Sequence, residues 1–121
     1  MGRVVHFEIT AGDTARARKF YSIFGWNIDD SGMEGMEYLL ARTGEASMGI
    51  DGAIMPKSYN AQPAILWISV DSLTDMMEQV KAAGGEIAGD PQTVPGIGST
   101  AYCRDTEGNV FGLIEPLPRS E

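Results

Sequence analysis

The chain contains a single histidine, His6, and a single cysteine, Cys103, and these counts limit the chemistry it can perform. They exclude a disulfide within the chain and any metal site that needs several cysteines or two histidines. Glu8 follows His6 by two residues, so an extended strand places both side chains on one face about 6–7 Å apart. A carboxylate beside an imidazole can tune its proton affinity for acid/base work. His6 and Glu8 are therefore the predicted catalytic pair; a solvated hydrogen-bonded pair, and packing of His6, are the alternatives.

A second set of side chains has the character of a small-molecule pocket. Residues 65–70 alternate as a strand, which places Ile65, Trp67 and Ser69 on one face. Pockets are lined mainly by aromatic and apolar groups with a few polar ones. We group four further residues with these three as predicted pocket residues: Tyr38, Met48, Ile50 and Tyr102. Ordinary core packing is the alternative interpretation.

The elements that would position these residues occur twice along the chain. The first half predicts a strand over 3–10, a helix that begins at Asp13 and ends near Gly25, and strands near 26–30, 36–42 and 47–52. The second half predicts a strand over 65–70, a helix from Ser72 to Gly84, and strands near 86–92, 99–104 and 109–115. A shift of 59 residues superposes His6 on Ile65 and Gly25 on Gly84. The pattern predicts two βαβββ modules.

The boundaries of these modules follow from the prolines between them. We expect one domain over 1–121, with modules of about 1–52 and 64–121. Residues 53–63 contain Pro56 and Pro63, and this composition predicts an extended linker. The sequence leaves open whether the modules pair within one chain or across a dimer.

Several motifs resemble one known family. The order of His6, Asp13 and Phe24-Gly25-Trp26 is similar to the opening of the vicinal-oxygen-chelate superfamily, and residues 104–112 resemble its D-x-x-G-N turn into the last strand. That superfamily includes glyoxalase I, bleomycin-resistance proteins and extradiol dioxygenases. The resemblance implies an α+β fold whose two βαβββ modules form a curved mixed sheet, a half-open cup, with the helices on its convex face. It also implies a homodimer.

The resemblance further implies four positions for a divalent metal, on the first, fourth, fifth and eighth strands. In this sequence they fall on His6, about Met48, Ile65 and Gly112, and only His6 is a usual metal ligand. Glu115 lies three residues after Gly112 and would face the other side of a regular strand. We therefore expect no metal cofactor and assign Gly112 to the pocket wall, with a divalent metal kept as the alternative.

The net charge and the lack of long apolar segments limit the expected partners and location of the protein. The sequence contains nine Lys and Arg residues and 17 Asp and Glu residues, which gives a net charge of −8. This negative charge disfavours nucleic acid and anionic membranes as partners. No signal peptide or membrane span is visible, so a cytoplasmic location is expected.

The combined prediction is a glyoxalase-like or bleomycin-resistance-like protein that binds, and can transform, a small organic molecule without a metal. If it is an enzyme, a lyase or isomerase is expected. Two alternatives stay open: a metal-dependent lyase, isomerase or dioxygenase with a site contributed differently, and a module that only sequesters its ligand.

Overall fold

The protein, in a computed structural model that describes residues 2–45 and 48–117, folds as two compact units. The first unit comprises His6–Ile65, and the second comprises Met1–Val5 with Leu66–Glu121. Each unit combines one α-helix with a mixed sheet, so the α+β class and the two βαβββ patterns predicted from the sequence are confirmed.

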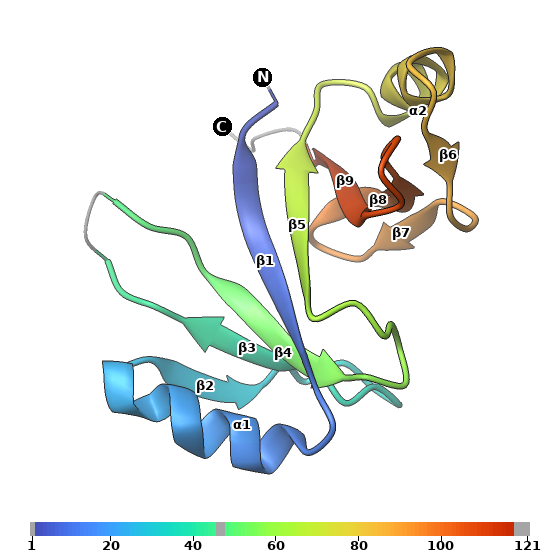
Figure 1. The fold of residues 1–121 in the computed structure, drawn as a ribbon. Helices are drawn as coiled ribbons and strands as arrows, with labels where there is room; N and C mark the ends of the chain where they lie inside the picture. Colours follow the sequence, from blue (N-terminus) through green and yellow to red (C-terminus); the bar gives the residue numbers. More distant parts are fainter. Residues whose placement is uncertain (1, 46–47, 118–121) are drawn as a thin grey trace. The chain divides into compact units, whose positions relative to one another are not determined.

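The first unit carries four strands beside its helix (Figure 1). Parallel pairing joins β1 to β4, and antiparallel pairing joins β4 to β3 and β3 to β2. The elements are β1 (Val4–Ala11), α1 (Thr14–Tyr21), the 3₁₀ turn η1 (Ser22–Phe24), β2 (Asn27–Asp30), β3 (Leu39–Arg42) and β4 (Gly52–Pro56).

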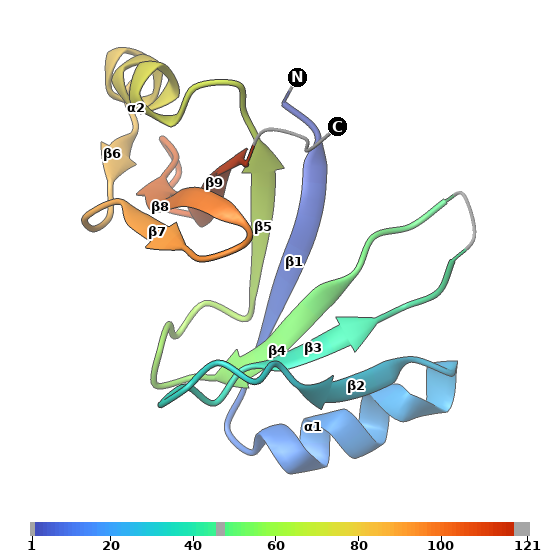
Figure 2. The same ribbon diagram turned by 180° about the vertical axis from the view of Figure 1, so that it is seen from behind.

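The second unit repeats this arrangement with one additional short strand (Figure 2). Here β5 pairs parallel with β9, β9 pairs antiparallel with β8, and β8 pairs antiparallel with both β6 and β7. The strand predicted near 86–92 is therefore two short strands. The elements are β5 (Ala64–Ser69), α2 (Leu73–Ala82), β6 (Glu86–Ile87), β7 (Gln92–Val94), β8 (Gly98–Arg104) and β9 (Val110–Pro116).

The helices begin where the sequence places capping residues. The Asp13 carboxylate accepts a hydrogen bond from the Arg16 backbone N–H at 3.0 Å, and the Ser72 hydroxyl accepts one from the Asp75 N–H at 3.2 Å. Such caps satisfy N–H groups that have no partner inside the helix. Gly25, which follows η1, has a φ of 82°, a backbone conformation that glycine adopts without strain.

Each helix covers one face of its own sheet. In the first unit, Ala17 and Tyr21 of α1 pack against the buried Ile28, Ala41 and Ile54. In the second unit, Leu73 and three further residues of α2 pack against the sheet; the full cluster is Ile68, Val70, Leu73, Met76, Met77, Val80, Ile87, Ala101, Cys103, Phe111 and Leu113. Candidate site residues lie on the opposite face of each sheet.

The strand predicted near 47–52 is wrong in position, because β4 begins at Gly52. Residue 47 lies outside the described residues; Met48 is 89% exposed, and neither it nor Ile50 lies in a strand. Residues 53–56, predicted to open the linker, instead lie in the buried strand. Residues 52–55 are all buried, so β4 is a continuous apolar run rather than an alternation, and Pro56 is its last residue.

Candidate functional site

Strand register determines which side chains of the first unit share the face opposite α1. Glu8 pairs with Ala53 and Thr10 with Met55, whereas Ile9 pairs with Ile54, which belongs to the cluster under α1. Since side chains alternate along a strand, His6, Glu8 and Thr10 lie on the helix-free face, as the alternation predicted.

A hydrogen-bond chain joins three side chains on this face. The Tyr38 hydroxyl donates to Oε2 of Glu8 at 2.6 Å, and Nε2 of His6 lies 2.9 Å from the same hydroxyl oxygen. Glu8 is only 2% exposed and Tyr38 only 8%. Tyr38 immediately precedes β3, so the fold brings it to β1 from 30 residues away. The chain therefore connects a buried carboxylate to a partly buried imidazole through a phenol.

With Glu8 as a carboxylate, this chain selects one tautomer of His6. An ionised carboxylate can only accept, so the single phenol proton of Tyr38 is directed to Glu8. The phenol oxygen must then accept from His6, which places the imidazole proton on Nε2 and leaves the lone pair on Nδ1. Burial lowers the pKa of His6 below its ordinary 6.5, although the charges of Glu8 and Asp51 counteract part of that effect. A lowered pKa favours the neutral form of the His6 imidazole at pH 7.

In the second unit, Trp67, Tyr102 and Gly112 meet on the face opposite α2. Gly112 pairs with Trp67 on one side and with Tyr102 on the other. The two ring centroids are 4.8 Å apart in an edge-on arrangement. A Cβ added to Gly112 would lie 2.3 Å from Cδ2 of Trp67, so the indole occupies the space above this glycine. Among the described residues, the Trp67 indole nitrogen is the one buried side-chain polar atom without a hydrogen-bond partner.

Four other predicted pocket residues are not part of these two groups of side chains: Ile65, Ser69, Met48 and Ile50. Ile65 is fully buried at the start of β5. Ser69 ends β5, and its backbone exchanges two hydrogen bonds with the N-terminal segment, one from the Gly2 N–H and one to the Arg3 carbonyl. Met48 and Ile50 lie outside the strands, between β3 and β4.

The structure corrects one of the four positions at which the family resemblance implies metal ligands. The pairs Glu8–Ala53 and Trp67–Gly112 are related by the same 59-residue shift, so the position on β4 that corresponds to Gly112 is Ala53 and not Met48. Sequence reasoning missed Ala53 because the strand was placed too early. Applying the 59-residue shift to Gly112 would have found it.

A divalent metal does not fit this donor set. Ala53, Ile65 and Gly112 have no coordinating side-chain atom, and the Trp67 ring fills the space where a side chain at 112 would begin. The Glu115 carboxylate instead accepts the Leu73 N–H at the start of α2 at 2.7 Å. Within residues 2–45 and 48–117 no group of three or more His, Cys, Asp or Glu side chains is arranged to hold a metal ion.

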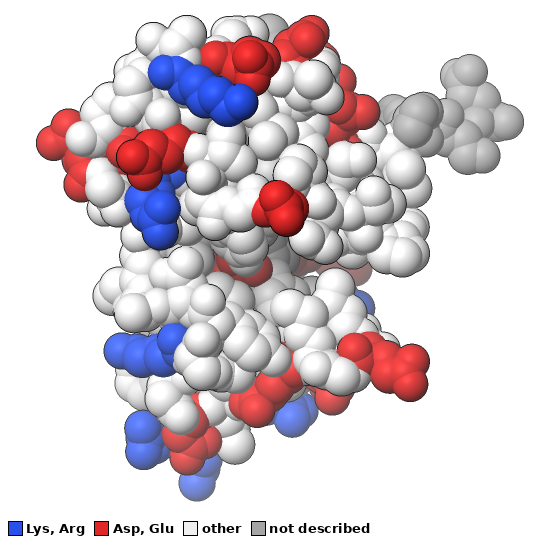
Figure 3. Space-filling view, turned by 90° about the vertical axis from the view of Figure 1, so that its right-hand side faces the viewer, with Lys and Arg blue, Asp and Glu red and all other residues white. Residues whose placement is uncertain are grey.

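Charged side chains of both signs are interspersed on the face seen in Figure 3 rather than separated into one acidic and one basic area. Within the part of the chain that the structure describes, no helix is long and apolar enough to cross a membrane.

Comparison with known proteins identifies relatives in one family. Residues 3–113 match the family model described as the glyoxalase/bleomycin resistance protein/dioxygenase superfamily. CFP32, a mycobacterial protein provisionally named a glyoxylase, is 25% identical over 127 residues in both Mycobacterium bovis and Mycobacterium tuberculosis. The alignment covers 98% of this chain and 46% of CFP32, so the chain spans about half the length of the curated relatives it matches.

Solved structures share the fold at low sequence identity. The hypothetical protein BH1468 from Bacillus halodurans aligns with a TM-score of 0.72 at 14% identity, over 99% of this chain and 98% of its own. Methylmalonyl-CoA epimerase from Mycobacterium tuberculosis aligns with a TM-score of 0.65 at 16% identity, over 97% and 89% of the two chains. At these identities the likeness establishes the fold alone.

Proposed function

Because the chain belongs to the glyoxalase/bleomycin resistance protein/dioxygenase superfamily, we propose that it binds a small organic molecule and moves a proton on it, as a metal-free isomerase or lyase. The observation that carries this proposal is the chain from His6 through Tyr38 to Glu8 on the helix-free face of the first unit. In this proposal His6 is the catalytic base, and Tyr38 and Glu8 are positioning residues.

The roles of these residues follow from their protonation states. Nδ1 of His6 carries a lone pair that can take a proton from a carbon or oxygen of the ligand. The imidazolium formed in this step keeps its Nε2–H on Tyr38, and the buried Glu8 carboxylate stabilises the new positive charge through the phenol. The proton can then return to a different ligand atom, which completes an isomerisation, or remain while a leaving group departs, which completes an elimination.

The most acidic C–H bonds in small metabolites lie beside carbonyl groups, so proton exchange at such carbons tests the proposal. The protein is incubated in D₂O with hydroxyacetone, lactaldehyde, pyruvate and acetoacetate, and loss of the C–H signals is followed by NMR. We expect accelerated exchange in at least one compound, with a rate that falls as pH drops through the lowered pKa of His6. His6→Gln should reduce the acceleration by about 10²-fold or more, the usual contribution of a general base.

Tyr38→Phe and Glu8→Gln test the positioning roles. Each should slow exchange while compound binding, followed by ligand-observed NMR, is retained; the matched control is Glu34→Gln, which removes an exposed acidic charge in the same unit. Exchange that is unchanged in His6→Gln would refute the role of His6. Binding without exchange in any compound would favour the sequestering alternative, and exchange that EDTA abolishes and Zn²⁺ or Ni²⁺ restores would favour the metal-dependent alternative.

The proposal also includes a homodimer, which the family resemblance implies, and the cytoplasmic location expected from the sequence. Light scattering coupled to size-exclusion chromatography measures the mass directly. A mass of one 13.0 kDa chain at micromolar concentration would exclude the dimer.

A further inference from the structure

An exposed carboxylate, that of Asp51, lies next to His6 on the helix-free face of the first unit. The first pair of the β1–β4 ladder is Phe7 with Gly52, so Asp51, which directly precedes β4, continues the ladder beside His6. Because side chains alternate along an extended segment, Asp51 and Ala53 share the helix-free face. The charge of Asp51 raises the pKa of His6, which agrees with this placement.

The residue that follows β3 holds Asp51 in this position. The Thr43 N–H donates to Oδ1 of Asp51 at 2.8 Å, and the Thr43 hydroxyl donates to the Ile50 carbonyl at 2.7 Å. These two hydrogen bonds join the end of β3 to the segment directly before β4. The place of the Asp51 carboxylate is therefore set by hydrogen bonds, and its second oxygen, Oδ2, takes part in neither of them.

The charge of Asp51 is not neutralised by the cations of its own unit. Within residues 2–45 and 48–117, none of the ion pairs includes Asp51. Arg42 ends β3, but its guanidinium is directed to Asp29 on β2, at the side of β3 away from β4. Lys57 lies beyond the end of β4, six residues after Asp51, which is about 20 Å in an extended segment. Since the Glu8 carboxylate is buried, Asp51 presents the exposed charge beside His6.

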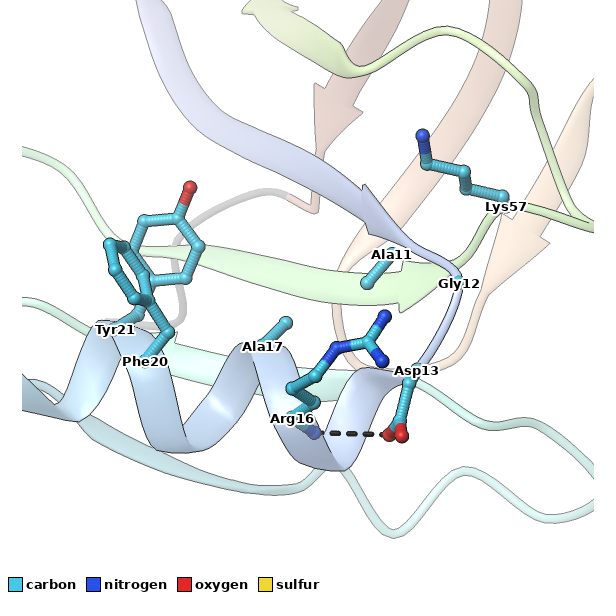
Figure 4. Close-up of a pocket in the computed structure, with 8 residues that line it drawn as sticks. All are labelled: Ala11, Gly12, Asp13, Arg16, Ala17, Phe20, Tyr21 and Lys57. Atoms are coloured by element: carbon cyan, nitrogen blue, oxygen red, sulfur yellow. Dashed lines mark hydrogen bonds between the residues drawn. The ribbon is translucent and has the colours of Figure 1, made fainter.

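A hollow of about 550 Å³ beside α1 does not offer an alternative site for an anionic ligand (Figure 4). Ala11 and Ala17 line this hollow and belong to the cluster under α1, so it lies on the face opposite to His6. The cations in its lining are Arg16 and Lys57, but the Lys57 ammonium points away from Arg16 and α1. The lining therefore presents no pair of converging cations.

We propose that Asp51 makes the His6 site select ligands by charge, so that neutral ligands and ligands with an ammonium group bind and carboxylates are disfavoured. This inference rests on the proposed function, because it concerns a ligand whose C–H bond reaches Nδ1 of His6. Neighbouring strands lie about 4.8 Å apart, so a small molecule at His6 is close to the Asp51 carboxylate. A negative charge at this range attracts a cationic group and repels an anionic one. The expected substrates are hydroxy- or amino-substituted carbonyl compounds rather than keto acids.

Three methyl ketones of similar size and different charge test the selectivity: pyruvate is anionic, hydroxyacetone is neutral and aminoacetone is cationic in neutral D₂O. Deuterium exchange of each is measured by NMR relative to its exchange in buffer, with the unchanged protein and with Asp51→Asn. The asparagine keeps an oxygen for the Thr43 N–H and removes the charge. The preference for aminoacetone over pyruvate should fall by about fivefold or more in Asp51→Asn. Salt at about 500 mM should also reduce the preference, because the carboxylate is exposed.

Two further variants separate the charge of Asp51 from other effects. Asp51→Glu restores the charge and should retain the preference, whereas Glu34→Gln removes an exposed charge elsewhere in the unit and should change the preference by less than about twofold. A preference that is unchanged in Asp51→Asn, or equally reduced in Glu34→Gln, would overturn the inference. Circular dichroism checks that each variant is folded.

The same compounds distinguish failure of this inference from failure of the proposed function. Absence of exchange in all three would contradict the proposed function, and the selectivity is then measured as binding by ligand-observed NMR. Aminoacetone should bind more tightly than pyruvate, and Asp51→Asn should remove most of this difference. Equal binding of the two compounds, or binding of none of the three, would overturn the role of Asp51.

Discussion

The contact between Gly112 and Trp67 allows the side-chain packing of the second unit to be tested. In Gly112→Ala the new Cβ would lie 2.3 Å from Cδ2 and Cε3 of the indole. Carbon atoms in contact are about 3.5–4.0 Å apart, so the indole must move by more than ~1 Å. It has little freedom to do so, since Trp67 is 8% exposed and the Tyr102 ring lies 4.8 Å away.

The expected cost follows from this geometry. Adding a methyl group to a packed site destabilises a protein by about 1–3 kcal/mol. For a chain of this length each kcal/mol lowers Tm by about 4 °C, so Gly112→Ala should melt roughly 4–12 °C below the unchanged protein. Urea unfolding followed by circular dichroism measures the free energy of unfolding, and thermal unfolding measures Tm.

A second glycine of the same unit supplies the control. Gly89 has ordinary backbone angles and no atom within 4 Å of an added Cβ, so Gly89→Ala should be neutral or stabilise by up to about 1 kcal/mol. In a Trp67→Leu background the cost of Gly112→Ala should largely disappear, because the clashing ring is gone. If Gly112→Ala were as stable as Gly89→Ala, the packing argument would be refuted. The metal argument at this position would fail with it, because a carboxylate side chain at 112 begins with the same Cβ.

The chain offers further tests at its lone histidine and cysteine. His6 is the only histidine, so its imidazole signals in ¹H NMR can be titrated without overlap, and we expect a pKa below 6.5. Glu8→Gln should lower this pKa further, because the negative charge of Glu8 raises the pKa of His6. A higher pKa in Glu8→Gln would contradict the contact between His6 and the Glu8 charge. Because the unfolded chain protonates His6 first as pH falls below 6.5, the free energy of unfolding should decrease from there down to the folded pKa, and less steeply in His6→Gln. Cys103 is fully buried, which raises the pKa of its thiol, so a disulfide reagent at pH 8 should modify the native protein at least about 10²-fold more slowly than the urea-unfolded chain.

Local features of the fold were predictable because their causes are local. Asp13 and Ser72 cap helices through hydrogen bonds to residues three positions away, so both partners of each cap are close together in the sequence. The alternation over 3–10 likewise placed His6 and Glu8 on one face. The 59-residue repeat was also visible, since the two units use the same order of strand, cap, helix and glycine, and the pairing of Glu8 with Ala53 and Trp67 with Gly112 confirms it.

Features that depend on neighbours distant in sequence were not predictable. The position of β4 was missed because residues 52–55 are all buried, so the strand does not alternate between apolar and polar residues, and because Pro56 resembles the start of a linker. Tyr38 was grouped with the pocket, but nothing near it in the sequence indicates that its hydroxyl joins His6 to Glu8.

The sequence by itself therefore determined the class of the fold, its internal repeat, the location of the one imidazole and the residue types without a ligand atom at Ile65 and Gly112. These properties depend on residue identity and on short-range periodicity, which the chain carries whether or not it is folded. Only the tertiary structure decided that His6 is paired through Tyr38 with a buried carboxylate, that Ala53 is the fourth position, and that Trp67 fills the space above Gly112. Strand register brings those groups together across 30 to 45 residues, and burial is what lowers the pKa of His6.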